Sequence, residues 1–150
     1  MSVPLGQPQA FELFTTRMTE FWPKEHSIGD SELAEVVIEP RRGGRWFERG
    51  VDGSECQWGR VAAWEPPRKV VLLWQIGADW RFDPEFETEV EVTFSPDEQD
   101  RCRLDLRHRN LQRYGDNTEQ MRAIFDDPAG WTGTLAGFVI LGGAQAASRR

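Results

Sequence analysis

Cysteine is scarce in this chain of 150 residues, which contains only Cys56 and Cys102. Two cysteines cannot form the disulfide framework of a small secreted domain, and no cluster of other metal-ligating residues surrounds them. We therefore expect no disulfide scaffold and no metal site. We also expect a reducing, cytoplasmic compartment for this protein.

Long apolar runs and an excess of positive charge are also missing. The longest apolar run, Leu135 to Ala144, has ten residues, whereas a helix that crosses a membrane needs about 20. No basic patch followed by an apolar stretch marks a secretory signal at the N-terminus. The 18 Lys and Arg residues against 25 Asp and Glu residues give a net charge of −7, which argues against nucleic-acid binding. The length fits one domain over residues 1–150, with a core from about residue 3 to about residue 145.

Large aromatic side chains are what the sequence has in abundance. Seven tryptophans and nine phenylalanines stand against one tyrosine. Packed cores and apolar ligand pockets both use such side chains. The composition therefore leaves both roles open.

The hydrophobic pattern changes from helical to alternating and back along the chain. A helix is expected from Pro8 to just before Phe21, because proline favours a helix start and Pro23 disfavours its continuation. The expected strands cover Ser2–Leu5, Leu33–Glu39, Arg45–Arg49, Gln57–Glu65, Lys69–Ile76, Glu85–Phe94 and Arg101–Arg109. Helical spacing returns after Asn117, is interrupted at residues 126–128, and continues from Trp131 to Gly142. This order predicts an α+β fold, in which helices cover one face of an antiparallel sheet.

The two strands on either side of Ser95–Asp100 alternate strictly between apolar and charged residues. Pairing Phe94 with Cys102 keeps both apolar sets on one face and turns an acid–base ladder to the other. This register places Thr88 opposite His108 on the inner face. His108 is then the only histidine that points inward.

The Pro66–Pro67 dipeptide predicts a rigid hairpin between two further strands. A two-residue turn there sets Gly59 opposite Trp74 and leaves space for the indole. It also turns Trp58 and Trp64 to the opposite face, toward the surface or an interface.

Several motifs together resemble one bacterial protein family. They are Trp22-Pro23 with His26-Ser27-Ile28, the run Ile38 to Glu48, Trp58-Gly59-Arg60-Val61, Trp64-Glu65-Pro66-Pro67, Leu106 to Arg109, and Gly130-Trp131. In this order and over about the whole chain, they resemble homologues of the activator of heat-shock-protein-90 ATPase. That family belongs to the SRPBCC (START-like, helix-grip) superfamily.

The resemblance implies a curved antiparallel sheet of about six to seven strands around a long C-terminal helix, with short N-terminal helices and a cavity in between. Members of the superfamily bind apolar molecules, and some are cyclases or hydrolases. The first strand of such proteins is shortened here to Ser2–Leu5, which would leave the edge beside Arg101–Arg109 open. Either the start codon lies further upstream, or a second subunit covers this edge in a homodimer.

His108 has two interpretations. It is an acid–base group in the cavity, or a core histidine that Thr88 or a backbone carbonyl satisfies. The sequence contains no triad, metal set or cofactor fingerprint, so we assign no catalytic residue and no cofactor. The arginines around Gly43-Gly44 lack a Walker lysine and indicate a solvated turn, in which Glu39 and Glu48 could pair with them.

The favoured hypothesis is a module that binds a small hydrophobic or amphipathic molecule between the sheet and the C-terminal helix. The expected pocket residues are Trp22, Trp46, Trp74, Thr88, His108, Trp131, Leu135 and Phe138. One alternative is a cyclase- or hydrolase-type enzyme that uses His108. The other is a chaperone cofactor that acts through an exposed patch around Trp58 and Trp64.

Overall fold

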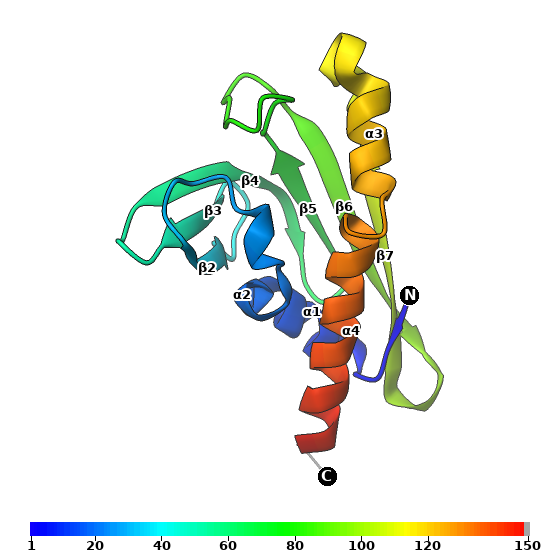
Figure 1. Cartoon of the computed structure of the whole chain (residues 1–150). Coiled ribbons are helices and arrows are strands. Elements are labelled where there is room, and N and C mark those ends of the chain that lie inside the picture. The colour runs from blue at the N-terminus through cyan, green and yellow to red at the C-terminus, as the bar shows by residue number, and fades with distance from the viewer. Residues whose placement is uncertain (149–150) are drawn as a thin grey trace.

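A seven-stranded antiparallel sheet dominates the computed structural model, which describes residues 1–148 (Figure 1). The strands are β1 (Ser2–Val3), β2 (Leu33–Ile38), β3 (Arg45–Gly50), β4 (Glu55–Glu65), β5 (Lys69–Trp74), β6 (Thr88–Asp97) and β7 (Arg101–Arg109). Their order across the sheet is β1-β7-β6-β5-β4-β3-β2. The short first strand thus pairs beside β7, where the sequence analysis placed it.

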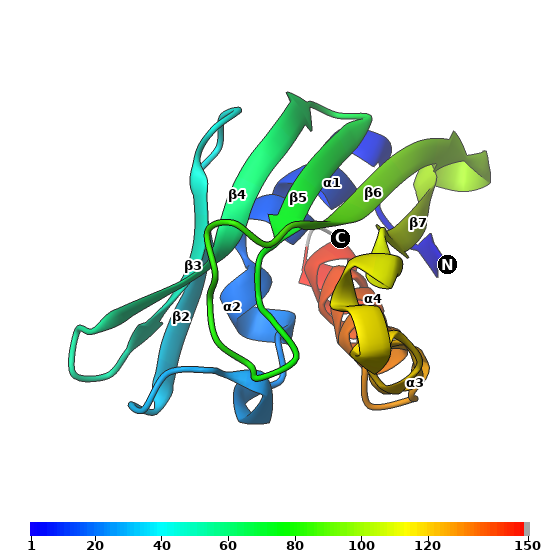
Figure 2. The same cartoon turned by 90° about the horizontal axis from the view of Figure 1, so that it is seen from above.

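The helices lie on the hollow side of this sheet. They are α1 (Gln7–Thr16), α2 (Met18–Phe21), α3 (Thr118–Asp126) and α4 (Trp131–Ser148), with 3-10 turns at Lys24–His26, Glu98–Asp100 and Leu111–Asn117. Figure 2 shows the strands as an arc around α1, α2 and α4. The predicted α+β helix-grip architecture is confirmed.

The register between β6 and β7 differs from the prediction by two residues. Phe94 pairs with Leu104, and Val90 pairs with His108. The difference arises because β6 continues through Pro96 to Asp97, and a three-residue turn then closes the hairpin. Proline is tolerated at a strand end, where the missing N–H needs no partner. A shift of two residues leaves every side chain on its predicted face.

Two irregularities in β4 change which of its residues face the helices. Trp58 is an extra residue between the pairs Trp46↔Gly59 and Phe47↔Gln57. A second shift, at Ala62, separates Val61 from Ala63 in the pairing with β5. A bulge re-aims the side chains beside it. The prediction that Trp58 and Trp64 face outward is therefore wrong, because Trp58 is fully buried and Trp64 packs against Phe11 of the core.

The predicted pairing of Gly59 with Trp74 is confirmed, but its reason is different. A Cβ atom on Gly59 would lie 1.6 Å from the carbonyl oxygen of Leu73. The glycine is required by this close backbone approach in the neighbouring strand, whereas the prediction invoked space for the indole.

Several predicted element ends are wrong: the helix expected from Pro8 is divided at Arg17 into α1 and α2, β1 ends at Val3, and β4 begins at Glu55. β5 ends at Trp74, and β6 begins at Thr88 because the Asp83 carbonyl and carboxylate accept the N–H groups of Phe86 and Glu85 in a turn. Helix α4 runs past Gly142 to Ser148. Gly142 does not end the helix; its lack of a side chain makes room for Val3, whose Cγ2 would lie 2.5 Å from a Cβ atom there.

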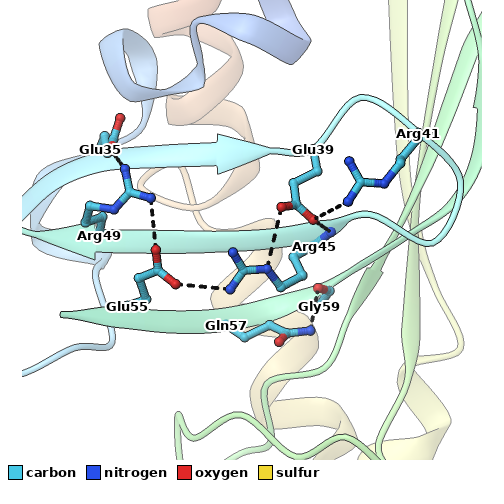
Figure 3. Close-up of polar contacts among 8 residues, drawn as sticks. All are labelled: Glu35, Glu39, Arg41, Arg45, Arg49, Glu55, Gln57 and Gly59. Atoms are coloured by element: carbon cyan, nitrogen blue, oxygen red, sulfur yellow. Dashed lines mark hydrogen bonds and ion pairs between the residues drawn. The ribbon is translucent and has the colours of Figure 1, made fainter. Parts of the chain in front are cut away.

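The outer face of β2, β3 and β4 carries a network of ion pairs (Figure 3). Its members are Glu35, Glu39, Arg41, Arg45, Arg49 and Glu55. The guanidinium groups of Arg45 and Arg49 lie 4.2 Å and 5.5 Å from the ring centre of Phe47 and cover it. This cover explains how an aromatic residue on the outer face is only 2% exposed.

Candidate functional site

Residues of α3 and of the loop between β5 and β6 line a cavity of about 580 Å³. Four separate segments line it. The lining residues are Trp22, Glu25, His26, Ser27, Ile28, Trp74, Trp80, Ala123, Ile124, Phe125, Asp127, Ala129, Gly130, Trp131 and Thr134. The volume is within the range of pockets that take drug-sized molecules.

Three of the eight residues expected in the pocket lie on its wall, namely Trp22, Trp74 and Trp131. The indoles of Trp22 and Trp131 meet at a centroid distance of 5.7 Å, and those of Trp74 and Trp131 at 6.0 Å. Trp46 is fully buried behind this wall, 5.6 Å from Trp74 and 5.3 Å from Trp58. The indoles therefore form one continuous cluster, of which part faces the cavity.

His108 and Thr88 lie behind the wall and are held by each other. The Trp131 indole N–H donates to His108 Nδ1 over 3.2 Å. Because this nitrogen accepts, the proton of the neutral ring is on Nε2, which donates to Thr88 Oγ1 over 2.8 Å. The Thr88 hydroxyl in turn donates to the Trp74 carbonyl oxygen over 3.0 Å.

This chain uses both nitrogens of His108. Burial lowers the pKa of His108 from 6.5 to about 3, so the ring is neutral at physiological pH. These contacts fit a core histidine satisfied by Thr88. They give no support to an acid–base role.

The other two expected pocket residues of α4, Leu135 and Phe138, do not line the cavity. Phe138 is buried against Phe14 and Phe21, at centroid distances of 5.5 Å and 5.2 Å. Leu135 is partly buried and packs on the same core. Phe138 thus packs α4 against α1 and α2.

Glu48 has a role that the sequence analysis missed. Its carboxylate is 2% exposed. One oxygen accepts the Ile28 N–H over 2.6 Å and the Trp58 indole N–H over 2.9 Å. The expected pairing with the nearby arginines is found for Glu39, whereas Glu48 fastens the cavity-lining segment around Ile28 to the sheet. The alternation of β3 places Glu48 on the same face as Trp46, and this signal was available in the sequence.

Trp80 and Ile124 are the most exposed large apolar side chains among the lining residues that sequence reasoning missed. Both are large apolar side chains with substantial exposure, 40% for Trp80 and 36% for Ile124. They come from the β5–β6 loop and from α3, which carry no alternating pattern that would place them at a cavity. Their exposure puts them where the cavity meets solvent.

Several buried polar atoms in and behind the cavity wall have no hydrogen-bond partner among the described residues. They are the indole nitrogens of Trp22, Trp46 and Trp74 and the side-chain oxygen of Gln75. Burial raises the pKa of the Tyr114 hydroxyl, and the neighbouring indole N–H of Trp74 opposes this rise. The Trp74 N–H nevertheless makes no hydrogen bond of normal geometry. Trp22 is therefore the clearest unpaired donor on the wall.

Residues 1–148 contain no group of three or more side chains that could hold a metal ion. Within the same residues, no helix is long and apolar enough to cross a membrane.

Comparison with known protein families identifies the family of this chain. Residues 8–140 match the model of the family described as activator of Hsp90 ATPase homolog 1-like proteins. The chain belongs to this family. The resemblance noted in the sequence is thereby confirmed, and the structural neighbours of this family member share its SRPBCC-type fold. Among curated proteins, none matches the chain significantly.

Two solved structures show what this family member is similar to. The first is an anthrahydroquino-Gama-pyrone synthase, Txn09, complexed with SUM. It is 34% identical, with a TM-score of 0.64, and the match covers 93% of this chain and 91% of the synthase. The second is the self-sacrificing resistance protein CalC from Micromonospora echinospora. It is 26% identical, with a TM-score of 0.72, and the match covers 97% and 92% of the two chains.

Proposed function

We propose that this protein binds a flat, uncharged, oxygen-bearing aromatic molecule in the cavity beneath α3. The observation that carries this proposal is the wall of four indoles, from Trp22, Trp74, Trp80 and Trp131, around a space of about 580 Å³. Indole faces stack on other aromatic rings with a preference for offset and edge-on geometries. A fused-ring molecule offers the most contact area to such a wall.

The ionisable groups of the wall disfavour an anionic guest. Glu25 and Asp127 are its acidic residues, and the described lining residues include no lysine or arginine. Apart from His26, a fatty acid or phosphorylated lipid would find no cationic side chain among the lining residues. The unpaired N–H of buried Trp22 needs an acceptor, which a carbonyl or hydroxyl oxygen on the guest supplies.

The synthase relative supports the same class of molecule. The synthase is named for a product that contains a fused anthrahydroquinone and an oxygen-bearing pyrone ring. Its identity of 34% over nearly the whole chain makes it the stronger of the two comparisons.

Ring closure of a bound polyketide is the second candidate function, and the synthase relative is the observation that favours it. His108 is not a suitable acid–base group for this reaction, because Trp131 and Thr88 occupy its two nitrogens. The chain would act by holding a flexible substrate in the folded conformation that precedes closure. The chaperone-cofactor alternative loses the exposed patch on which it was based, since Trp58 is buried.

Titration with 9-anthracenemethanol, followed by calorimetry and by tryptophan fluorescence, tests the binding proposal. Ala123→Trp fills the cavity from α3 and should abolish binding. Gln120→Trp adds the same side chain on an exposed position of α3 that does not line the cavity, and should leave binding unchanged. Oleate should not compete. If the wild-type protein ignores the anthracene probe but binds oleate, the cavity is a lipid site and the proposal is wrong.

A further inference from the structure

Trp80 combines two unfavourable features at the cavity. Its backbone φ is +61°, in the left-handed region where a bulky residue is a rare outlier. Trp80 is 40% exposed, which makes it the most exposed of the seven tryptophans. Neither feature is explained by packing of the core.

The conformation of Trp80 is imposed by hydrogen bonds on both sides. The Trp80 N–H donates to the Gly77 carbonyl oxygen over 2.9 Å, and the Gly77 N–H donates to the Arg81 carbonyl oxygen over 2.9 Å. Asp79 Oδ1 accepts the Arg81 N–H over 3.1 Å. A strained residue persists where its surroundings determine it in this way, and such residues concentrate at ligand sites.

The strained conformation holds Trp80 at the opening of the cavity. Five large hydrophobic residues of the described chain are well exposed, namely Met1, Val51, Trp80, Ile124 and Ile140. Of these five, only Trp80 and Ile124 line the cavity. Figure 1 places the β5–β6 loop and α3, which carry them, at the same end of the molecule. A guest between these two side chains would remove both from water.

We infer that Trp80 is the specificity-determining residue of the cavity, which stacks on the exposed face of a bound fused-ring aromatic molecule and closes the opening over it. This inference rests on the proposed function and adds which side chain selects flat rings. A saturated guest of similar length gains only non-directional contact from Trp80. A fused-ring guest also gains stacking.

Binding of 9-anthracenemethanol and of 1-decanol to three variants of Trp80 tests this inference. Trp80→Ala and Trp80→Gly should weaken binding of the anthracene probe by about tenfold or more, which is the range expected for loss of one stacked ring. Both should weaken binding of 1-decanol much less. Trp80→Phe keeps a ring and should bind the anthracene probe within about threefold of wild type. Ile140→Ala, which truncates an exposed side chain of α4 outside the cavity, should change neither affinity.

Two further measurements separate stacking from a merely structural role. The bound probe should protect part of the tryptophan emission that acrylamide quenches, and the protected part should be clearly smaller in Trp80→Phe, because Trp64 and Trp131 are less exposed than Trp80. Trp80→Gly should melt at a higher temperature than Trp80→Ala, because both lack the indole but only glycine accepts a positive φ without strain.

The outcomes distinguish the two claims. Binding of the anthracene probe with equal affinity by wild type, Trp80→Ala and Trp80→Gly would overturn the inference and leave the proposed function standing. Failure of wild type to bind either probe would overturn both. An equal loss of affinity for anthracene and decanol would show that Trp80 covers the opening without selecting flat rings, which also contradicts the inference.

Discussion

Trp131, the first residue of α4, donates its indole N–H to Nδ1 of His108 on β7 over 3.2 Å. This bond joins the C-terminal helix to the sheet and determines which tautomer of the imidazole is present. It also makes Trp131 serve two purposes, because the same indole forms part of the cavity wall.

The neutral state of His108 makes stability depend on pH. The pKa of His108 is lowered to about 3 in the folded protein by burial, whereas it is about 6.5 in an unfolded chain. The unfolded chain therefore takes up a proton between these values that the folded protein does not. The contribution of neutral His108 to the free energy of unfolding is therefore fully present above pH 6.5 and is lost as the pH falls toward 3. The free energy of unfolding falls by up to about 1.4 kcal/mol per pH unit in this range.

Urea unfolding at pH 7, 6 and 5 measures this slope. His108→Gln keeps a donor for Thr88 and an acceptor for Trp131 but cannot be protonated, so its free energy of unfolding should change less over this range. The other histidine, His26, is present in both proteins and cancels in the comparison. Equal slopes in the two proteins would mean that His108 is not held neutral.

Gly59→Ala should destabilise the protein strongly. The new Cβ atom would lie 1.6 Å from the Leu73 carbonyl oxygen, so β4 and β5 must separate locally. We expect a loss of about 2–3 kcal/mol or more in the free energy of unfolding. Gly143→Ala is the matched control, because a Cβ atom there meets nothing within 4 Å inside α4. It should stabilise the protein by about 0.5–1 kcal/mol. The opposite order of stabilities would contradict the close approach of the strands.

Glu48→Leu should loosen the segment around Ile28 and weaken ligand binding. The substitution leaves the N–H groups of Ile28 and Trp58 without their acceptor, at a cost of about 2–4 kcal/mol. Glu48→Gln retains an oxygen at the same place and should lose less than half as much. Amide hydrogen exchange at Ile28 provides the local readout, and it should speed up in the leucine variant before any global unfolding. Unchanged exchange there would show that Glu48 does not hold this segment.

The two thiols should react slowly and in a definite order. Burial is the main cause that raises the pKa of both Cys56 and Cys102 above the usual value. Cys102 is fully buried, and Cys56 is partly exposed. With a thiol reagent at pH 8, we expect one slow modification at Cys56 and a second only after denaturation. Mass spectrometry of the intact protein counts the modifications, and mass spectrometry of its peptides assigns the sites. Early labelling of Cys102 would mean that the start of β7 opens readily.

The open edge beside β7 stays a prediction. The backbone groups of Met1 and Leu104 bond each other at 2.9 Å and 2.8 Å, and β1 pairs with β7 at Arg103 and Cys102. The described chain places no strand against the rest of this side of β7. A homodimer that covers it, like the cytoplasmic location, awaits a direct measurement.

Local side-chain patterns were enough to predict the class of fold, the faces of β6 and β7, and the pairing of Gly59 with Trp74. These properties follow from the two-residue period of strands, in which a face is determined by parity alone. Even the error of two residues in the β6–β7 register left Thr88 close enough to bond His108.

The cavity depended on the three-dimensional arrangement. Bulges in β4 turned Trp58 and Trp64 inward. The apolar–polar alternation of the residues before a bulge does not show that an extra residue follows, so the sequence did not reveal these bulges. The lining residues come from four segments far apart in the chain, including the Trp80 loop and α3. A pocket is the space that packing leaves unfilled between such segments, so its walls are decided by the distances between elements and by rotamers, which no local pattern encodes.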